Sequence, residues 1–234
     1  MRQTWLIFNK EFKDYFISPI AYIVIAIFLF VTGWLFFSKF FIYGQVDLRL
    51  FFNLLPFIFA FVVPAITMRL FSEELNVGSY EILLTMPVTF RDIIVGKFLA
   101  GVAFVAAILI PTLAYPIFIS FFGDLDWGVV AGSYLGSILL GAAYVAIGLF
   151  ASSLTRNQII ALIVGMVICF LLSIIDRMLF FFPHSTLGVF AYLSSAIHFE
   201  NIAKGIVDTR DIVYFLSMMF MGLYATHLVM LEKK

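Results

Sequence analysis

The sequence is poor in charge. Only 12% of its 234 residues are Asp, Glu, Lys or Arg, whereas soluble domains average about 25%. Hydrophobic residues make up 64% of the chain, and the mean hydropathy is +1.12. Such a chain lacks the polar side chains needed to cover a water-soluble globule. The scarcity of charge therefore excludes a soluble protein and indicates a membrane protein.

A basic surface and a disulfide framework are missing as well. The 14 Lys and Arg residues balance the 14 Asp and Glu residues, so no basic stripe is available to bind nucleic acid. The single cysteine, Cys169, cannot form an internal disulfide, and its mid-span position favours a small core residue. No small-residue cleavage site follows the first apolar run, so we expect that run to stay as an anchor.

Catalytic motifs are absent from the sequence. It contains no G-x-x-x-x-G-K-[ST], because Gly96 and Lys97 are followed by Phe98 rather than by Ser or Thr. Neither H-E-x-x-H nor G-x-S-x-G occurs, which argues against an intramembrane hydrolase. We therefore expect the chain not to be an enzyme, and any nucleotide hydrolysis to come from another chain.

Long apolar runs dominate what is present. Crossing about 30 Å of hydrocarbon takes about 20 apolar residues, and the absence of strand-like alternation makes the spans helical. The six predicted spans cover residues 20–43, 51–69, 98–122, 128–154, 158–182 and 212–231. The pieces between them are too short to fold separately. We therefore predict a single transmembrane domain over residues 1–234.

Lysine and arginine predict the orientation, because they are enriched on the cytoplasmic side. If both termini are cytoplasmic, the inner positions are Arg2, Lys10, Lys13, Arg69, Arg91, Lys97, Arg156, Lys233 and Lys234. The outer positions are then Lys39, Arg49, Arg177, Lys204 and Arg210. This excess of basic residues inside predicts cytoplasmic termini, an inward-facing loop over 70–97 and an outward-facing loop over 183–211.

The segment 1–19 before the first span has the pattern of an interfacial helix. Aromatic residues recur at spacings of three and four, at Trp5, Phe8, Phe12 and Tyr15 or Phe16. This spacing predicts a helix lying in the headgroup region with its rings toward the membrane. Ser18 and Pro19 are expected to end it. Two roles remain open: a simple anchor, or an elbow that transmits motion from a cytoplasmic partner.

The loop 70–97 carries a second helical pattern. Gly78 and Ser79 favour a helix start, and Pro87 forbids its continuation, so a short helix is predicted over 79–86. A capping box at Thr89 and Asp92 predicts that the next helix begins there. The apolar face of the short helix has no evident partner in this chain. It suits docking into a groove of another protein, or else packing on its own bundle.

These features resemble the permeases of type-2 ATP-binding-cassette (ABC) exporters. The matching loop residues are Arg69, Glu73, Glu74, Gly78, Glu81, Leu83, Leu84, Thr85, Pro87 and Lys97. Similar stretches extend over nearly the whole chain, namely KEFKDYFISPIAYIV, FVVPAITMRLFSEE, GSYLGSILLGAAYVAIGLFASSLTRNQIIA and HFENIAKGIVDTRDIVYFLS. Within the family, the sequence most resembles the gliding-motility-associated permease, the F subunit.

The resemblance implies an all-α membrane protein: six transmembrane helices, an N-terminal interfacial helix, a cytoplasmic coupling helix and an outer-leaflet helical gate. It implies a permease subunit in the bacterial inner membrane that binds no cofactor itself. The implied partners are cytoplasmic ATPases carrying ATP and Mg, a second permease copy or homologue, and an auxiliary periplasmic or membrane subunit. The implied coupling residues are Glu73, Glu74, Gly78, Tyr80, Glu81, Leu83, Leu84 and Pro87. The implied gate residues are His198, Phe199, Glu200, Asp208, Arg210 and Asp211.

Small residues recur along the fourth predicted span, at Gly132, Gly136, Ser137 and Gly141. They permit close helix packing, either within the chain or between subunits. No ionisable residue lies in the middle of a predicted span, which argues against secondary transport. His198 and Glu200 form only a weak metal-binding pattern. The alternative function is a scaffold or force-transmitting subunit that transports nothing.

Overall fold

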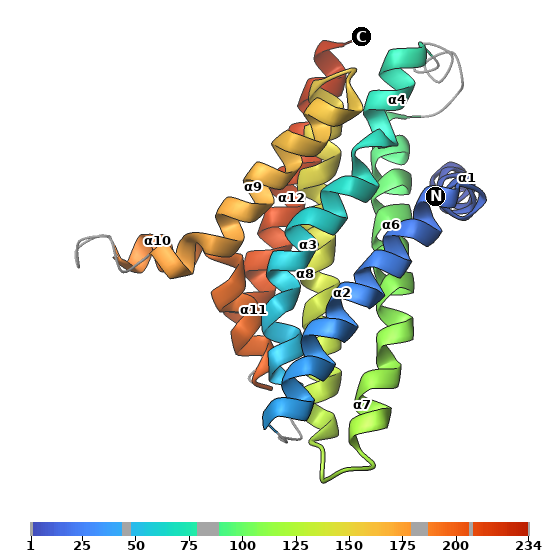
Figure 1. Cartoon of the computed structure of the whole chain (residues 1–234). Coiled ribbons are helices and arrows are strands. Elements are labelled where there is room, and N and C mark those ends of the chain that lie inside the picture. The colour runs from blue at the N-terminus through green and yellow to red at the C-terminus, as the bar shows by residue number, and fades with distance from the viewer. Residues whose placement is uncertain (1, 44–47, 79–88, 179–186, 206–207, 234) are drawn as a thin grey trace.

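The protein is almost entirely helical in the computed structural model (Figure 1), which describes residues 2–43, 48–78, 89–178, 187–205 and 208–233. No strand occurs among these residues. Their six helices with the length and hydropathy to cross a membrane are Pro19–Ile42, Phe51–Val77, Phe90–Ile119, Trp127–Leu154, Gln158–Met178 and Thr209–Glu232. The predicted all-α class with six candidate spans is confirmed.

Helix α1 (Arg2–Ile17) lies across one end of the bundle, and Figure 1 shows it nearly along its axis. The rings of Trp5, Phe8, Phe12 and Phe16 form a row with successive centroid distances of 4.8, 5.7 and 5.1 Å. The last three rings pack against the core, whereas Trp5 is exposed. The aromatic spacing therefore gives α1 one face that holds it to the bundle.

Helix α2 (Pro19–Tyr43) begins directly after Ser18. Proline suits the first position of a helix, because its fixed φ is already helical and its missing N–H has no partner there. The chain therefore leaves α1 and enters the first span within two residues, where Ser18 and Pro19 were predicted to end the interfacial helix.

Helix α3 (Arg49–Thr67) is followed by α4 (Arg69–Val77) after a one-residue break at Met68. The helical path predicted to end near residue 69 therefore continues for about two more turns. Gly78 then ends α4 with a φ of +77°, a left-handed conformation that glycine adopts without a Cβ clash.

Helix α6 (Phe90–Leu109) starts at the predicted capping box. Thr89 Oγ1 accepts a hydrogen bond from the backbone N–H of Asp92 at 3.2 Å, which satisfies one free donor of the first turn. The helix then tightens into η1 (Ile110–Leu113) and continues as α7 (Ala114–Ile119). Both short elements contain a proline, which removes an intrahelical hydrogen bond and accounts for the irregular path.

Helix α8 (Trp127–Leu154) is the centre of the bundle and contacts α3, α4, α6, α9, α11 and α12. Gly, Ala and Ser make up much of its buried surface, so neighbouring backbones approach it closely. Helices α9 (Gln158–Met178) and α12 (Thr209–Glu232) pack on either side of it. Cys169 of α9 is buried, as expected for a core residue.

Two short helices lie between α9 and α12. Figure 1 shows α10 (Leu187–Leu193) projecting sideways from the bundle, while α11 (Ser195–Ala203) lies among the long helices. Ser194 separates them and caps α11 by accepting the N–H of Ile197 at 3.4 Å. We refer to this pair as the α10–α11 hairpin.

The bundle has two distinct ends. We use the name α4 end for the one that carries α1, α4 and the last turn of α12, at the top of Figure 1. The α7 end is the opposite one, formed by α7 and the start of α8. Buried polar groups gather near both ends, and they differ in chemistry.

Candidate functional site

The candidate site is the junction of α1, α4 and α6 at the α4 end. Helix α1 packs extensively on α6, and Thr4 Oγ1 of α1 lies 2.6 Å from Asp92 Oδ1 of α6. Helices α4 and α6 flank residues 79–88, the segment that holds the predicted coupling helix over 79–86. Contacts that hold α1, α4 and α6 together therefore also connect the two helices on either side of residues 79–88.

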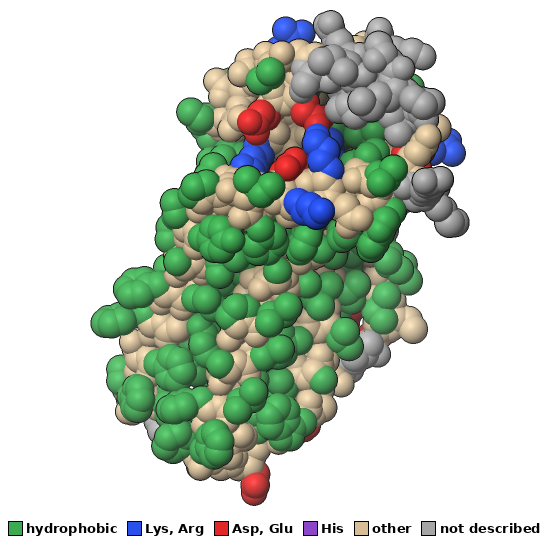
Figure 2. Space-filling model, turned by 90° about the vertical axis from the view of Figure 1, so that its right-hand side faces the viewer, with side chains coloured by type: hydrophobic (Ala, Val, Ile, Leu, Met, Phe, Trp, Pro, Cys, Tyr) green, Lys and Arg blue, Asp and Glu red, His purple; other side chains and the backbone are tan. Residues whose placement is uncertain are grey.

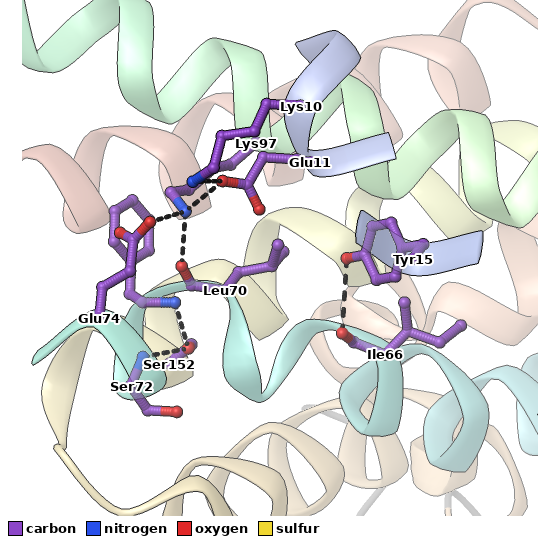
Figure 3. A network of polar contacts seen from close by, with 10 residues as sticks. Lys10, Glu11, Tyr15, Ile66, Leu70, Ser72, Glu74, Lys97 and Ser152 are labelled. Carbon is purple, nitrogen blue, oxygen red and sulfur yellow. Dashed lines mark hydrogen bonds and ion pairs between the residues drawn. The ribbon is translucent and has the colours of Figure 1, made fainter. Parts of the chain in front are cut away.

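Lys97 of α6 is the centre of the junction, and its side chain is only 1% exposed. Its Nζ donates to Glu11 Oε1 of α1 at 3.0 Å and to Glu74 Oε1 of α4 at 2.8 Å. A third bond, of 2.8 Å, reaches the carbonyl of Leu70 (Figure 3). The same ammonium lies 5.2 Å from the ring centroid of Phe71. All three ammonium donors are thus used, which is what a buried charge requires.

Ser152 of α8 fastens α4 where the helix is interrupted. Its Oγ accepts the backbone N–H groups of Phe71 and Ser72, both at 3.0 Å (Figure 3). It also donates to the carbonyl of Met68 at 2.7 Å. The first N–H groups after a helix break lack intrahelical partners. One serine from the central helix therefore supplies the cap that α4 itself does not provide.

Tyr15 and Arg69 form a second contact between α1 and the α3–α4 path. The Tyr15 hydroxyl donates to the carbonyl of Ile66 at 3.4 Å, and the Arg69 guanidinium lies 5.3 Å from the Tyr15 ring centroid. Burial raises the pKa of Tyr15 above its usual range, helped by the Glu11 carboxylate. Tyr15 therefore stays a neutral hydrogen-bond donor at physiological pH.

A cavity of about 460 Å³ opens beside the junction. Its lining consists of Lys10, Glu11, Asp14, Tyr15, Ile17, Ser18, Arg69, Leu70, Glu73, Glu74, Val77 and Lys97. Figure 2 shows charges of both signs gathered in this region, above a broad hydrophobic surface. The junction thus lies where a charged end of the bundle meets its apolar flank.

The predicted coupling residues divide into two groups. Glu74 takes part in the Lys97 junction, Glu73 is exposed on the same helix, and Gly78 ends it. The predicted helix 79–86 and the coupling residues Tyr80, Glu81, Leu83, Leu84 and Pro87 lie outside the described residues. The structure therefore places the base of the predicted coupling region.

Sequence reasoning missed the roles of Lys97 and Glu11. Lys97 was placed at the end of the loop 70–97, in the helix that the capping box predicted, but its burial in the packed bundle was not foreseen. A lysine followed by the apolar run FLAGVAFVAAIL was a usable signal, because a cation on a buried helix needs carboxylate partners. The partners themselves, 86 and 23 residues away in sequence, required the fold.

The predicted gate residues also divide, by burial. On α11, His198 and Phe199 are buried, whereas Glu200 is exposed and pairs with Lys204 at 2.8 Å. On α12, Asp211 is 2% exposed and lies 2.5 Å from His198. The two remaining residues, Asp208 and Arg210, are exposed at the start of α12.

Asp208 has a local structural role. Its Oδ1 accepts the backbone N–H of Arg210 at 3.0 Å. This bond holds the pKa of the Asp208 carboxyl below its usual range, so the carboxylate remains an N-cap for α12 until the pH falls well into the acid range. The described residues contain no group of three or more His, Cys, Asp or Glu side chains able to hold a metal.

A buried hydroxyl network fixes the start of α11. Tyr144 of α8 lies 2.6 Å from Ser173 Oγ and 2.7 Å from Ser195 Oγ. Ser173 also donates to the carbonyl of Pro56, and Ser195 to that of Leu172. The network therefore connects α3, α8, α9 and α11, and sequence patterns gave no sign of it.

The small residues of α8 face other helices of the same chain. A Cβ added at Gly136 would lie 2.8 Å from Ile202 Cγ2 of α11, and one at Gly141 would lie 2.5 Å from Val105 Cγ1 of α6. Ser137 is buried, and Gly132 lies near the carbonyl of Ile202. These contacts favour packing within the chain over packing between subunits.

Comparison with known proteins gives one family. Residues 5–219 match the family model described as ABC-2 family transporter protein. A search of curated proteins finds no match. The match includes α4 and α6 with the segment between them, and ends within α12.

Proposed function

The chain belongs to the ABC-2 transporter family, and from this premise we propose that it is the permease subunit of an ATP-driven exporter, moved through its α4 end. Family membership makes it a multi-pass membrane component of an ABC transporter, with the ATPase on a partner subunit. We place ATP and Mg on that partner. Residues 73–87 are the proposed docking segment.

The Lys97 junction is the observation that supports this proposal. A force applied to residues 79–88 reaches α4 on one side and α6 on the other. Because Lys97 holds Glu74 of α4 and Glu11 of α1 together, the two helices and the interfacial helix would respond as one unit. Packed charged networks of this kind transmit displacement because they resist continuous deformation.

Docking has a direct test in cells that also produce a candidate ABC ATPase partner. We expect Leu83→Asp with Leu84→Asp to abolish co-purification of the ATPase, because two carboxylates would enter an apolar interface. The matched control is Phe121→Asp with Gly123→Asp, which adds the same charge at the α7 end. Retained binding by the first variant would refute the docking segment.

Orientation is tested separately. The excess of basic residues at the α4 end supports placing that end in the cytoplasm of a bacterial inner membrane. In a Cys169→Ala background, we expect Asn76→Cys to react with an impermeant maleimide only after the cells are permeabilised. Asp124→Cys, at the α7 end, should react in intact cells. The reverse result would invert the topology and remove the docking proposal with it.

A second permease copy or homologue completes the proposed complex, with an auxiliary periplasmic or membrane subunit as a further candidate. Helices α2, α9 and α12 leave much of their apolar surface exposed, and on α3 the aromatic residues Phe57 and Phe61 are exposed as well. We propose that cargo passes at the interface between the two permeases, beside an external gate formed by the α10–α11 hairpin. The resemblance to the gliding-motility permease leads us to propose gliding or secretion as its process.

Transport itself distinguishes this proposal from a force-transmitting scaffold. The complex is reconstituted in vesicles with its ATPase, and ATP hydrolysis is measured together with movement of candidate amphipathic cargo. Export predicts hydrolysis that cargo stimulates and net transfer across the bilayer. Hydrolysis with a change of shape but no transfer of any candidate would support the scaffold instead.

A further inference from the structure

We infer that His198 and Asp211 form a proton-dependent latch that holds the α10–α11 hairpin against α12. His198 lies on α11, Asp211 lies in the first turn of α12, and Tyr192, whose carbonyl also contacts the imidazole, belongs to α10. One ring thus connects three helices. The side chains of His198 and Asp211 are 6% and 3% exposed, so water does not replace these contacts.

The geometry sets the number of protons in the latch. His198 Nε2 lies 3.0 Å from the carbonyl oxygen of Tyr192, and a carbonyl only accepts, so Nε2 carries a proton. His198 Nδ1 lies 2.5 Å from Asp211 Oδ1, and this contact also needs one proton between its two atoms. The closed latch therefore holds two protons, whichever atom of the second pair carries the shared one.

Loss of one proton breaks one of the two contacts. A neutral imidazole has a single N–H, so it donates either to Asp211 or to Tyr192. Asp211 Oδ2 is buried with no hydrogen-bond partner, and the Asn201 amide reaches Oδ1 only at 3.5 Å, so the carboxylate depends on the imidazole N–H for its short hydrogen bond. The helix N-terminus also favours a charged Asp211. The remaining proton therefore stays at Nδ1, and the carbonyl of Tyr192 loses its donor.

The consequence is local to α10. Helix α11 stays fixed, because Ser195 bonds to Tyr144, and Ser133 of α8 donates to the carbonyl of Ala203 at 3.1 Å. Among the side chains of α10 that the structure describes, Tyr192 and Leu193 are about half exposed. The Tyr214 hydroxyl, 2.7 Å from the carbonyl of Leu193, is a second polar contact between α10 and α12. Raising the pH therefore loosens α10 and leaves α11 in place.

Other ionisable groups near the latch act in a different pH range or pair elsewhere. The Tyr214 ring stacks on His198 at 4.0 Å, and the Tyr192 ring contacts its edge at 5.1 Å; phenols ordinarily ionise near pH 10. Glu200 pairs with Lys204 on the exposed face of α11. On α9, Asp176 and Arg177 line a small cavity together with Glu200 rather than with His198. Imidazole is the side chain that ordinarily changes charge near neutrality.

The experiment uses the full chain in lipid nanodiscs, with Cys169→Ala and a spin label at Gly188→Cys. Gly188 lies on α10, and a Cβ there meets no atom within 4 Å. Labelling is done at neutral pH, and spectra are then recorded from pH 5 to 9. We expect one immobile component at low pH and a mobile component at high pH. Their ratio should change by about tenfold per pH unit, the slope for release of one proton. A label at Leu135→Cys on α8 should show no change.

Two variants decide whether the pair is the cause. Asp211→Asn can donate its amide N–H to Nδ1, so a neutral imidazole satisfies both contacts and α10 should stay immobile up to pH 9. His198→Gln should remove the pH response altogether, whereas Glu200→Gln should keep it. An unchanged response in Asp211→Asn, or no response in the parent protein, would overturn the latch. Because the readout is mobility, it holds or fails independently of ATPase docking and of transport.

Discussion

The two ends of the bundle bury ionisable groups in different ways. At the α4 end, one lysine is shared by two carboxylates and all its donors are satisfied, although Glu74 Oε2 has no hydrogen-bond partner. Toward the α7 end, a single histidine faces a single carboxylate, whose second oxygen likewise has no partner. Lysine and glutamate ordinarily ionise far from neutral pH, whereas imidazole ordinarily titrates close to it. The first junction is therefore suited to permanent force transfer, and the second to a contact that opens and closes.

The largest effect is expected from Lys97→Met. The substitution leaves Glu11 and Glu74 without the cation they share, and breaking a buried ion pair from one side costs about 3–5 kcal/mol. We expect a much lower thermal midpoint in detergent and a poor yield of monodisperse protein. Lys10→Met is the matched control, because this lysine is 61% exposed and also faces Glu11. It should cost less than about 1 kcal/mol.

A triple variant distinguishes the effect of the unpaired charges on stability from the effect of the altered packing. Lys97→Met combined with Glu11→Gln and Glu74→Gln removes all three charges at once, so no carboxylate is left unpaired. Removing one partner of a buried ion pair is costly because it leaves an uncompensated buried charge, and since the triple variant leaves none, we expect much of the lost thermal stability to return. If Lys97→Met alone unfolds at the temperature of the parent protein, the junction does not hold the three helices together.

A smaller effect on stability is expected from replacing either of two glycines by alanine. Gly96 lies near the Lys97 junction, and Gly136 packs against α11. At Gly96 a Cβ would lie 2.8 Å from Ile7 Cγ2 and 3.0 Å from the Thr4 carbonyl, so α1 itself must move. At Gly136 the atoms it would meet are side-chain atoms, the nearest being Ile202 Cγ2. Overpacking costs about 1–3 kcal/mol, and we expect Gly96→Ala to cost more of the unfolding free energy than Gly136→Ala.

A second substitution at each site tests the comparison of the two glycines, because it removes the side chain that the added methyl group would meet. Ile202→Ala removes the methyl that an alanine at position 136 would meet, so Gly136→Ala with Ile202→Ala should be less unstable than the sum of the two single changes. Ile7→Ala should rescue Gly96→Ala less well, because the Thr4 carbonyl remains. Equal rescue at the two sites would show that α1 is as adaptable as a side chain.

Tyr144→Phe should have a modest effect. It removes the hydroxyl shared by Ser173 and Ser195, but both serines keep backbone carbonyl partners. A hydrogen bond of this kind contributes about 1 kcal/mol net. We expect a drop of that size in unfolding free energy, measured in mixed micelles, and greater mobility of a label on α11. Tyr224→Phe, at an exposed site, serves as the control.

The smallest effect is expected from Glu200→Gln. The Glu200–Lys204 pair is about half exposed on both sides, and such surface pairs contribute about 0.3–0.5 kcal/mol at most. The thermal midpoint should therefore stay within measurement error, even though this residue was predicted to belong to the gate. A clear loss of stability would mean that another subunit or the bilayer buries the pair.

The sequence predicted local features, such as helix caps and spans, better than contacts between residues that are far apart in the chain. The proline after Ser18, the Thr89–Asp92 capping box and the apolar runs are contiguous in the chain, so they indicate their own structure. Lys97 was placed at the end of the loop 70–97, in the helix predicted from the capping box, because a lysine normally marks the end of a span. Here the cost of burying it is offset by carboxylates that the sequence alone does not bring near.

The sequence by itself determined the class of the protein. A chain with so little charge and six long apolar runs has to satisfy its backbone inside a membrane, and helices do so within each run. The fold decided which of the few charges meet. Glu11, Glu74 and Lys97, and likewise His198 and Asp211, become pairs only when separate helices pack, because the energy of a buried charge depends on what lies within a few ångströms of it.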